Sequence, residues 1–132
     1  MSETKLNETG PNETMPNETG PALIWSPFPD QDSALAVIHA LLDEGLAACG
    51  NLMPGMTSVF VWNGEKDTAH ELGLMVKTNA ALLDAAVARL TEMHPYEEPA
   101  VLGWRCETGA PGTLAWLASI APLEEASGTP ES

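Results

Sequence analysis

A long segment, Ala48–Trp62, ends at the dipeptide Asn63-Gly64, and its second half is rich in β-branched and aromatic residues. Asn-Gly is the strongest short-range signal for a two-residue β-hairpin turn, because both residues tolerate positive φ. Extended at about 3.3 Å per residue, the segment would span about 50 Å, whereas a domain of this size is roughly 35 Å across. The hairpin therefore either kinks, most simply at Pro54-Gly55, or extends beyond its own sheet.

The two outcomes for the hairpin predict different assemblies. A hairpin that extends beyond the sheet exposes its strand edges together with Phe60 and Trp62, and long apolar edges invite pairing with another chain. We therefore expect a closed homo-oligomer. The alternative is a monomer whose hairpin kinks back onto its own sheet.

Strands and helices alternate around this hairpin. Apolar and β-branched runs predict four strands, of which the first is closed by a loop at Ser26–Pro29; the strands are expected at Ala22–Trp25, Met56–Trp62, Ala69–Lys77 and Ala100–Arg105. Apolar residues at spacings of three and four predict two helices between the strands. The order βαββαβ is an α+β, ferredoxin-like arrangement, in which two helices cover one face of an antiparallel sheet. The other face is left open.

Local signals set the ends of the helices. Asp30 or Asp32 can cap the first helix, and Gly45 suits its C-terminal stop. Thr78 or Asn79 can cap the second, which must end before Pro95. A short terminal helix is expected at Thr113–Ile120.

Charge limits the partners of the chain. Its 132 residues carry 19 acidic and 5 basic side chains, a formal charge of −14, so nucleic acid and anionic membrane surfaces are not expected partners. An Asn-Glu-Thr repeat, too short and polar to build a core, predicts a disordered tail over residues 1–21. The folded domain is expected at 22–120, followed by a flexible acidic tail at 121–132.

The two cysteines, Cys49 and Cys106, can form at most one disulfide. The first twenty residues lack the apolar core of a secretory leader, and no segment approaches the roughly 20 apolar residues of a membrane span. A cytoplasmic protein with reduced thiols is therefore predicted.

The stretch His94-Pro95-Tyr96-Glu97-Glu98-Pro99 places an imidazole, a phenol and two carboxylates within six residues. Pro95 disfavours helical geometry at the residue before it, so His94 should lie on a fixed turn after the second helix. Such a stretch is either a binding site or a rigid connection between helix and strand.

Motifs for catalysis are missing from the sequence. We find no Cys-x-x-Cys, no His-Glu-x-x-His, no phosphate-binding glycine loop and no Ser nucleophile elbow, so an enzyme is not expected. His94 and Cys49 could supply a nitrogen and a thiolate suited to copper or zinc, but two ligands do not complete a tetrahedral site. Core packing is the alternative role for Cys49.

Several separate motifs resemble the divalent-cation tolerance, or CutA, proteins. They occur in order across residues 22–120, and they are Leu46–Ser58, Trp62-Asn63-Gly64, Glu71, Val76-Lys77-Thr78, His94-Pro95-Tyr96 and Leu114–Leu117. The resemblance implies a ferredoxin-like fold, a tight homotrimer whose long hairpins extend sheets between subunits, a cytoplasmic setting and a link to copper and other divalent cations.

The resemblance also implies which residues form the site, although this chain departs from the family pattern at several positions. In some members of the family, copper is assigned to a cysteine at the end of the first strand and to consecutive histidines before Pro-Tyr; these positions hold Ser26 and Met93-His94 here. We therefore predict His94, with Cys49, as metal ligands for Cu(II) or another divalent cation. The intersubunit cleft is expected to hold Trp62, Glu71, Lys77 and Tyr96, although Glu65, Ala100 and Thr113 depart from the family pattern nearby.

Two functions remain open from the sequence. One is a trimeric protein of divalent-cation binding, tolerance or response, with cations attracted by the acidic surface. The other is a trimeric small-ligand-binding or signalling scaffold, like the similarly folded PII regulators, with no direct role for metal.

Overall fold

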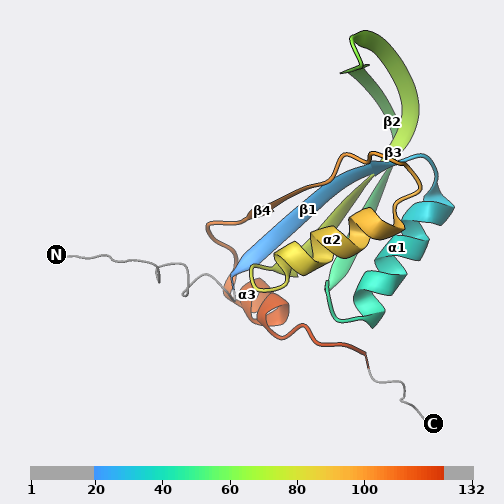
Figure 1. Ribbon diagram of the computed structural model, residues 1–132. Coiled ribbons are helices and arrows are strands. Elements are labelled where there is room, and N and C mark those ends of the chain that lie inside the picture. Colours follow the sequence, from blue (N-terminus) through green and yellow to red (C-terminus); the bar gives the residue numbers. More distant parts are fainter. Residues whose placement is uncertain (1–19, 124–132) are drawn as a thin grey trace.

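The computed structural model describes residues 20–123, so the tails predicted at 1–21 and 121–132 lie almost wholly outside the described residues. Four strands and three helices follow one another in the predicted order (Figure 1). Their bounds are β1 Pro21–Phe28, α1 Gln31–Asp43, β2 Cys49–Trp62, β3 Glu65–Asn79, α2 Leu83–Met93, β4 Leu102–Arg105 and α3 Pro111–Ala118.

The strands form one antiparallel sheet in the order β2-β3-β1-β4. Helices α1 and α2 lie side by side on one face of this sheet, and α3 lies near its end beside the start of β1 (Figure 1). This is the ferredoxin-like α+β fold that the sequence predicts.

The face of the sheet beneath α1 and α2 holds the core. Alternate residues of the two central strands point to it, because successive side chains of a strand point to opposite faces. Ile24 pairs with Val76 and Phe28 with Leu72, and these side chains pack against buried residues of the helices, among them Leu41 and Leu90.

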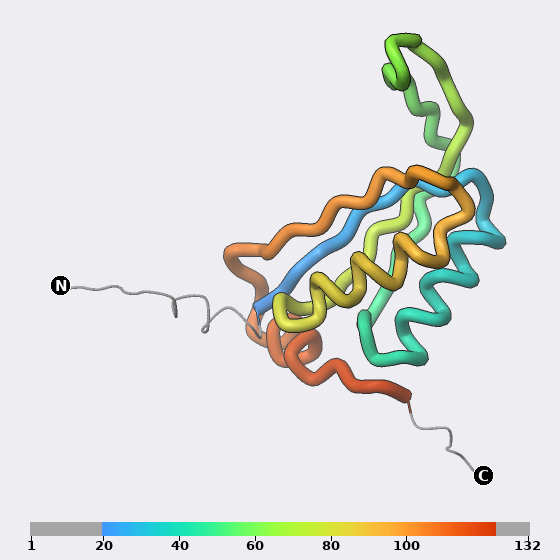
Figure 2. Tube along the Cα trace, viewed as in Figure 1, coloured from blue at the N-terminus to red at the C-terminus, as the bar shows by residue number. Residues whose placement is uncertain are grey.

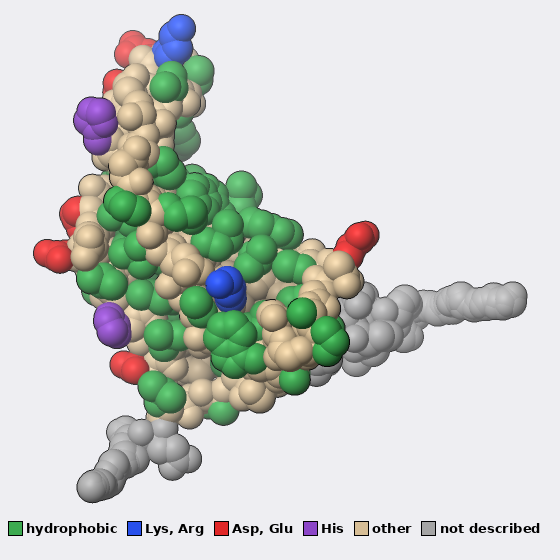
Figure 3. All heavy atoms as spheres, turned by 180° about the vertical axis from the view of Figure 1, so that it is seen from behind, with side chains coloured by type: hydrophobic (Ala, Val, Ile, Leu, Met, Phe, Trp, Pro, Cys, Tyr) green, Lys and Arg blue, Asp and Glu red, His purple; other side chains and the backbone are tan. Residues whose placement is uncertain are grey.

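The opposite face of the sheet, called the open face below, is not covered by any helix of residues 20–123 (Figure 1). Figure 3 shows that hydrophobic side chains cover most of it. The strand register places six large apolar residues there, namely Leu23, Trp25, Met53, Met75, Leu102 and Trp104. Three of them are exposed, Leu102 at 66%, Trp104 at 42% and Met53 at 40%.

The hairpin of β2 and β3 both bends and extends beyond the sheet, so the two outcomes that the sequence left as alternatives occur together (Figures 1 and 2). It closes at Asn63 and Gly64, whose φ values of 53° and 80° fit the expected turn. The register shifts between Met53 and Met56, where Gly55 has a φ of 76°. This β-bulge increases the local bend of β2. The outer part of the hairpin, residues 56–71, is called the arm below.

The prediction that a loop at Ser26–Pro29 closes the first strand is wrong, because β1 continues to Phe28. Pro27 pairs with Gly73 of β3, but its carbonyl bonds the ring of His94 and thus points away from β3. In an extended residue the backbone N and O point to the same edge of the strand, so the N–H that Pro27 lacks would have pointed toward the β4 side of β1. On that side β4 pairs only with Ala22–Trp25 and does not reach Pro27. The missing donor costs no sheet hydrogen bond.

The start of α2 also differs from the prediction. Thr78 and Asn79 remain in β3, and the helix begins only at Leu83. Asn79 Oδ1 accepts the N–H of Leu82 at 3.0 Å, so it caps the turn before the helix rather than the helix itself. Of the two caps predicted for α1, Asp30 and Asp32, the structure shows Asp30, which accepts the N–H of Ser33 at 2.8 Å.

Candidate functional site

A cleft of about 590 Å³ lies where the arm meets the turn between α2 and β4. The chain in this turn passes the base of the hairpin and the end of β1 (Figure 2). Residues of β1, of the arm and of the turn after α2 line the cleft, so segments far apart in the sequence meet there. The lining residues are Pro27, Ser58, Phe60, Val61, Trp62, Glu71, Tyr96, Glu97, Glu98, Pro99 and Ala100.

The arm supplies one wall of the cleft. Ser58, Phe60 and Trp62 alternate along β2 and so share one face of the strand. Met56 pairs with Glu71 directly after the bulge, so Glu71 lies on this same face. The bend at Pro54-Gly55 therefore directs two aromatic side chains and a carboxylate toward the turn.

His94 fixes the turn that forms the opposite wall. Its ring is 7% exposed and stacks on Phe28, with the ring centroids 4.0 Å apart. Nδ1 accepts the N–H of Tyr96 at 3.1 Å, and Nε2 lies 2.9 Å from the carbonyl oxygen of Pro27. Because a carbonyl only accepts, neutral His94 carries its proton on Nε2 and donates it there.

The surroundings of His94 favour the neutral ring. Burial lowers its pKa below 6.5, and the carbonyl of Pro27 and the charge of Glu71 only partly oppose this effect. Both ring nitrogens are engaged within the chain, so a metal ion could bind His94 only by displacing one of these hydrogen bonds. His94 thus holds Tyr96 in place.

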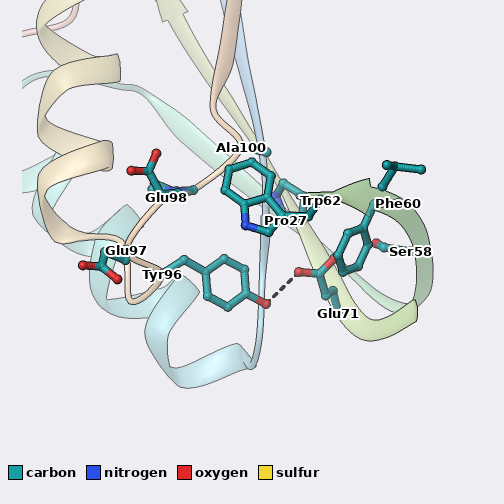
Figure 4. Close-up of a pocket in the computed structure, with 11 residues that line it drawn as sticks. Pro27, Ser58, Phe60, Trp62, Glu71, Tyr96, Glu97, Glu98 and Ala100 are labelled. Carbon is teal, nitrogen blue, oxygen red and sulfur yellow. Dashed lines mark hydrogen bonds between the residues drawn. The ribbon is translucent and has the colours of Figure 1, made fainter. Parts of the chain in front are cut away.

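Tyr96 and Glu71 join the two walls. The Tyr96 hydroxyl donates to Glu71 Oε2 at 2.7 Å (Figure 4). Burial, together with the hydrogen bond and negative charge of Glu71, raises the pKa of Tyr96 to about 12. The phenol therefore stays protonated at neutral pH and remains a donor to the carboxylate.

The electrostatic character of the cleft is acidic. Glu71, Glu97 and Glu98 line it, and none of the described lining residues is Lys or Arg. Figure 4 shows the Glu71 carboxylate among the aromatic rings, whereas Glu97 and Glu98 extend outward from the turn. One carboxylate thus points into the cleft and two add negative potential at its rim.

Cys49 and Lys77 lie at the other end of the sheet. They pair across β2 and β3, with Lys77 Nζ 3.9 Å from Cys49 Sγ. Lys77 is six residues from Glu71 along β3, about 20 Å away. The expected cleft residues Trp62, Glu71 and Tyr96 therefore come together, and within one chain Lys77 does not join them.

Cys49 and His94 do not converge on a common metal within one chain. Cys49 pairs with Lys77, whereas His94 bonds Pro27, the partner of Gly73. Lys77 and Gly73 are four residues apart on β3, about 13 Å. Across residues 20–123 no group of three or more His, Cys, Asp or Glu side chains is placed to hold a metal ion. Within one chain, His94 and Cys49 therefore do not fit a shared copper site.

Phe60, Pro27 and Pro99 belong to the cleft but were not assigned to it from the sequence. The place of Phe60 in the cleft could have been predicted, because Phe60 alternates with Trp62 on an expected strand and so shares a face with it. Pro27 had none, since the sequence placed it in a loop.

The fold and cleft define a class of protein: a ferredoxin-like α+β domain with an extended hairpin whose base forms an acidic, aromatic cleft. The family model described as "CutA1 divalent ion tolerance protein" matches residues 22–120. The chain belongs to this family. Its resemblance to CutA proteins, inferred from the motifs, is thereby confirmed.

Individual relatives agree with this assignment. The divalent-cation tolerance protein CutA of Thermus thermophilus is 36% identical over 89 residues, which cover 67% of this chain and 86% of the relative. Protein CutA of Mus musculus is 33% identical over 101 residues, 76% of this chain, but the match spans only 57% of the mouse protein. The crystal structure of CutA from Xylella fastidiosa superimposes with a TM-score of 0.70 at 38% identity, covering 74% of this chain and 93% of that one.

None of the helices found within residues 20–123 has the length and hydrophobicity needed to cross a membrane.

Proposed function

We propose that this chain acts in divalent-cation tolerance or response as a cytoplasmic homotrimer, and that the cleft at the base of its arm is where cations act. The observation that most directly supports this proposal is the acidic cleft, found in a member of a divalent ion tolerance family. The described residues that line the cleft include three carboxylates and no Lys or Arg. Such a cleft attracts positive charge and disfavours anions.

The donor set favours weak binding of hard cations. The inward-pointing donors are the carboxylate of Glu71 and the hydroxyl of Tyr96, and oxygen donors suit ions such as Mg²⁺, Ca²⁺ and Mn²⁺ better than copper. Glu97 and Glu98 are directed outward and contribute charge rather than convergent coordination. Cations would then concentrate in the cleft without a closed coordination shell.

The open face supports self-association. Its exposed Leu102 and Trp104 lie beside Leu23 and Trp25 of β1, and a contiguous apolar surface of this kind is typical of protein interfaces. The arm adds strand edges with exposed Val59 and Val61. Homotrimerisation would cover both features. Light scattering tests it, and a particle near the 14.0 kDa of one chain would refute the trimer.

Calorimetric titration of the full chain with zinc(II), manganese(II) and copper(II) tests where cations bind. We expect Glu71→Gln to weaken manganese and zinc binding about tenfold, roughly the loss of 1.4 kcal/mol. Cys49→Ser and the charge-matched control Glu107→Gln should leave binding unchanged. Unaltered affinity in Glu71→Gln would reject the cleft, and loss of binding in Cys49→Ser together with His94→Ala would restore the ligands first predicted from the sequence.

A second candidate function is a small-ligand-binding scaffold, and the size of the cleft favours it. Its volume of about 590 Å³ falls within the range of roughly 300–1,000 Å³ found for small-molecule sites. A metal ion with its waters would leave most of that space unused. The acidic lining of the cleft favours a ligand of positive charge over an anion.

A further inference from the structure

The turn between α2 and β4 forms one wall of the cleft, but its own backbone does little to hold it. Pro95 and Pro99 lack an N–H, and none of the backbone–backbone hydrogen bonds found among residues 20–123 involves the segment from Pro95 to Val101. Hydrogen bonds from side chains hold this segment instead. The position of the wall therefore depends on those side chains.

Ser26 bonds the far end of the turn to β1. Its hydroxyl donates to the carbonyl oxygen of Ala100 at 2.8 Å. Ser26 alternates with Ile24 and so lies on the face of the sheet beneath α1 and α2, and its backbone pairs with Leu74 of β3. A buried hydroxyl without a partner costs free energy. The bond to Ala100 avoids this cost and ties the turn to a strand that the sheet already fixes.

His94 bonds the start of the turn to the same stretch of β1. Its ring joins the carbonyl of Pro27 to the N–H of Tyr96 and stacks on Phe28. Both ends of the turn are thus held by the three consecutive residues 26–28. Within one chain Ser26 is 0% exposed and His94 7%, and assembly of several chains adds to this burial rather than removing it.

The same bonds occupy the donors that a copper ion would need. Copper is assigned, in some members of the family, to the positions that hold Ser26, Met93 and His94 here. Ser26 lacks the thiolate that suits copper, and Met93 packs against the core. Nδ1 of His94, the ring nitrogen with a free lone pair, already accepts the N–H of Tyr96. The residues present do not fit a copper site at these positions.

We infer that Ser26 and His94 are paired positioning residues for the cleft, which hold the turn on β1 and are not copper ligands. Through Tyr96, which donates to Glu71 at 2.7 Å, they set where the turn meets the arm. The inference deepens the proposed function, and it rests on that function only in taking the cleft as the site of cation binding.

Hydrogen exchange of the Tyr96 amide in the full-length, assembled protein tests the positioning role, because this N–H bonds His94 within the turn. Ser26→Ala should speed the exchange about fivefold, which corresponds to the loss of one hydrogen bond. His94→Phe keeps an aromatic ring against Phe28 but removes two hydrogen bonds, so it should speed the exchange more than about tenfold. Unchanged exchange in Ser26→Ala would overturn the inference.

Thr78→Val is the matched control for a purely structural effect. Thr78 is also a fully buried hydroxyl, and it donates to the backbone carbonyl of Leu46 at 2.8 Å. Thr78→Val should lower the stability to urea by about as much as Ser26→Ala, yet leave the exchange of the Tyr96 amide unchanged. If both variants speed that exchange equally, Ser26 contributes only to global stability and the positioning role is rejected.

Calorimetric titration with copper(II) tests the other half of the inference. The wild type, Ser26→Ala and His94→Phe should give the same result, because the two side chains are engaged with the backbone. Copper affinity that falls in either variant would show that these residues bind the metal, and would overturn the inference.

The manganese(II) titration of Glu71→Gln tests the proposed function separately. Exchange of the Tyr96 amide is measured without metal, so the two results are independent. A cleft that does not bind manganese would reject the proposed function, whereas the positioning role would still be decided by the exchange of Ser26→Ala against Thr78→Val.

Discussion

The two faces of the sheet are built from the same strands, but helices cover one face and leave the other open. On the helix-covered face, Ile24, Leu74 and Val76 are fully buried. On the open face, their strand neighbours include Trp25 and Met75, which pair across β1 and β3 without a helix above them. Alternation along a strand gives both faces apolar residues, but only one face is buried within the chain.

This difference separates folding from assembly. Burial beneath α1 and α2 stabilises a single chain, so changes there should alter the free energy of unfolding. The open face contributes its apolar surface only when another chain covers it, so changes there should act on association. The cleft lies at the border, since Glu71 and Phe60 continue the open face into the arm.

Leu74→Ala should have the largest effect on stability. Removing a fully buried leucine side chain from the helix-covered face should lower the free energy of unfolding by about 3 kcal/mol. Urea denaturation measures the change. The matched control is Leu102→Ala on the open face, for which we expect a loss below about 1 kcal/mol at concentrations where the protein is dissociated. Equal losses would contradict the distinction between the faces.

Trp104→Glu should have the largest effect on assembly. A charge placed on the open face opposes burial against another chain, so light scattering should detect a smaller particle while circular dichroism remains that of a folded domain. Trp116→Glu is the control, because Trp116 is similarly exposed at 45% but lies on α3. If Trp116→Glu dissociates the protein and Trp104→Glu does not, the interface lies elsewhere.

His94 should make stability depend on pH. Its folded pKa is lowered below 6.5, so between the two pKa values the unfolded chain binds more protons than the folded one. Stability should therefore be full above pH 6.5 and decrease as pH falls through 6.5 toward the folded pKa. Urea denaturation across this range should show the decrease, and His94→Gln should reduce it. His39→Gln, which alters an exposed histidine, should not; if it does, the decrease does not arise at His94.

The smallest predicted effect concerns Tyr96. It is the only tyrosine of the chain, so tyrosinate absorbance reports on this residue alone. Its pKa should be about 12, and Glu71→Gln should move it toward 10 by removing the acceptor charge. The raised pKa also means that this group's stabilising contribution is present below pH 10 and lost as pH rises through 12. A wild-type midpoint near 10 would show that the Tyr96–Glu71 hydrogen bond does not form in solution.

The sequence contained what local chemistry determines. Asn63-Gly64 specified the turn of the hairpin, and the length of the hairpin predicted that it would either bend near Pro54-Gly55 or extend beyond the sheet. Residues whose partners are local or periodic were therefore predictable.

The role of His94 was not predictable in this way. Its ring bonds Pro27, 67 residues earlier in the chain, and stacks on Phe28, in a strand that the sequence ended too early. A histidine with a Pro-Tyr step looks the same in sequence whether its nitrogens face a metal or the backbone. Only the tertiary contacts distinguish a ligand from a residue that holds a turn.

Paramagnetic broadening by manganese(II) tests the central claim, that cations gather in the cleft around Glu71 rather than beside Cys49 and Lys77 at the other end of the sheet. In amide NMR spectra of the assembled protein, substoichiometric manganese(II) should first broaden the signals of Glu71, Tyr96, Glu97 and Glu98, and Glu71→Gln should reduce this broadening. Broadening centred on Cys49 and Lys77, or broadening that is unchanged in Glu71→Gln, would contradict the claim.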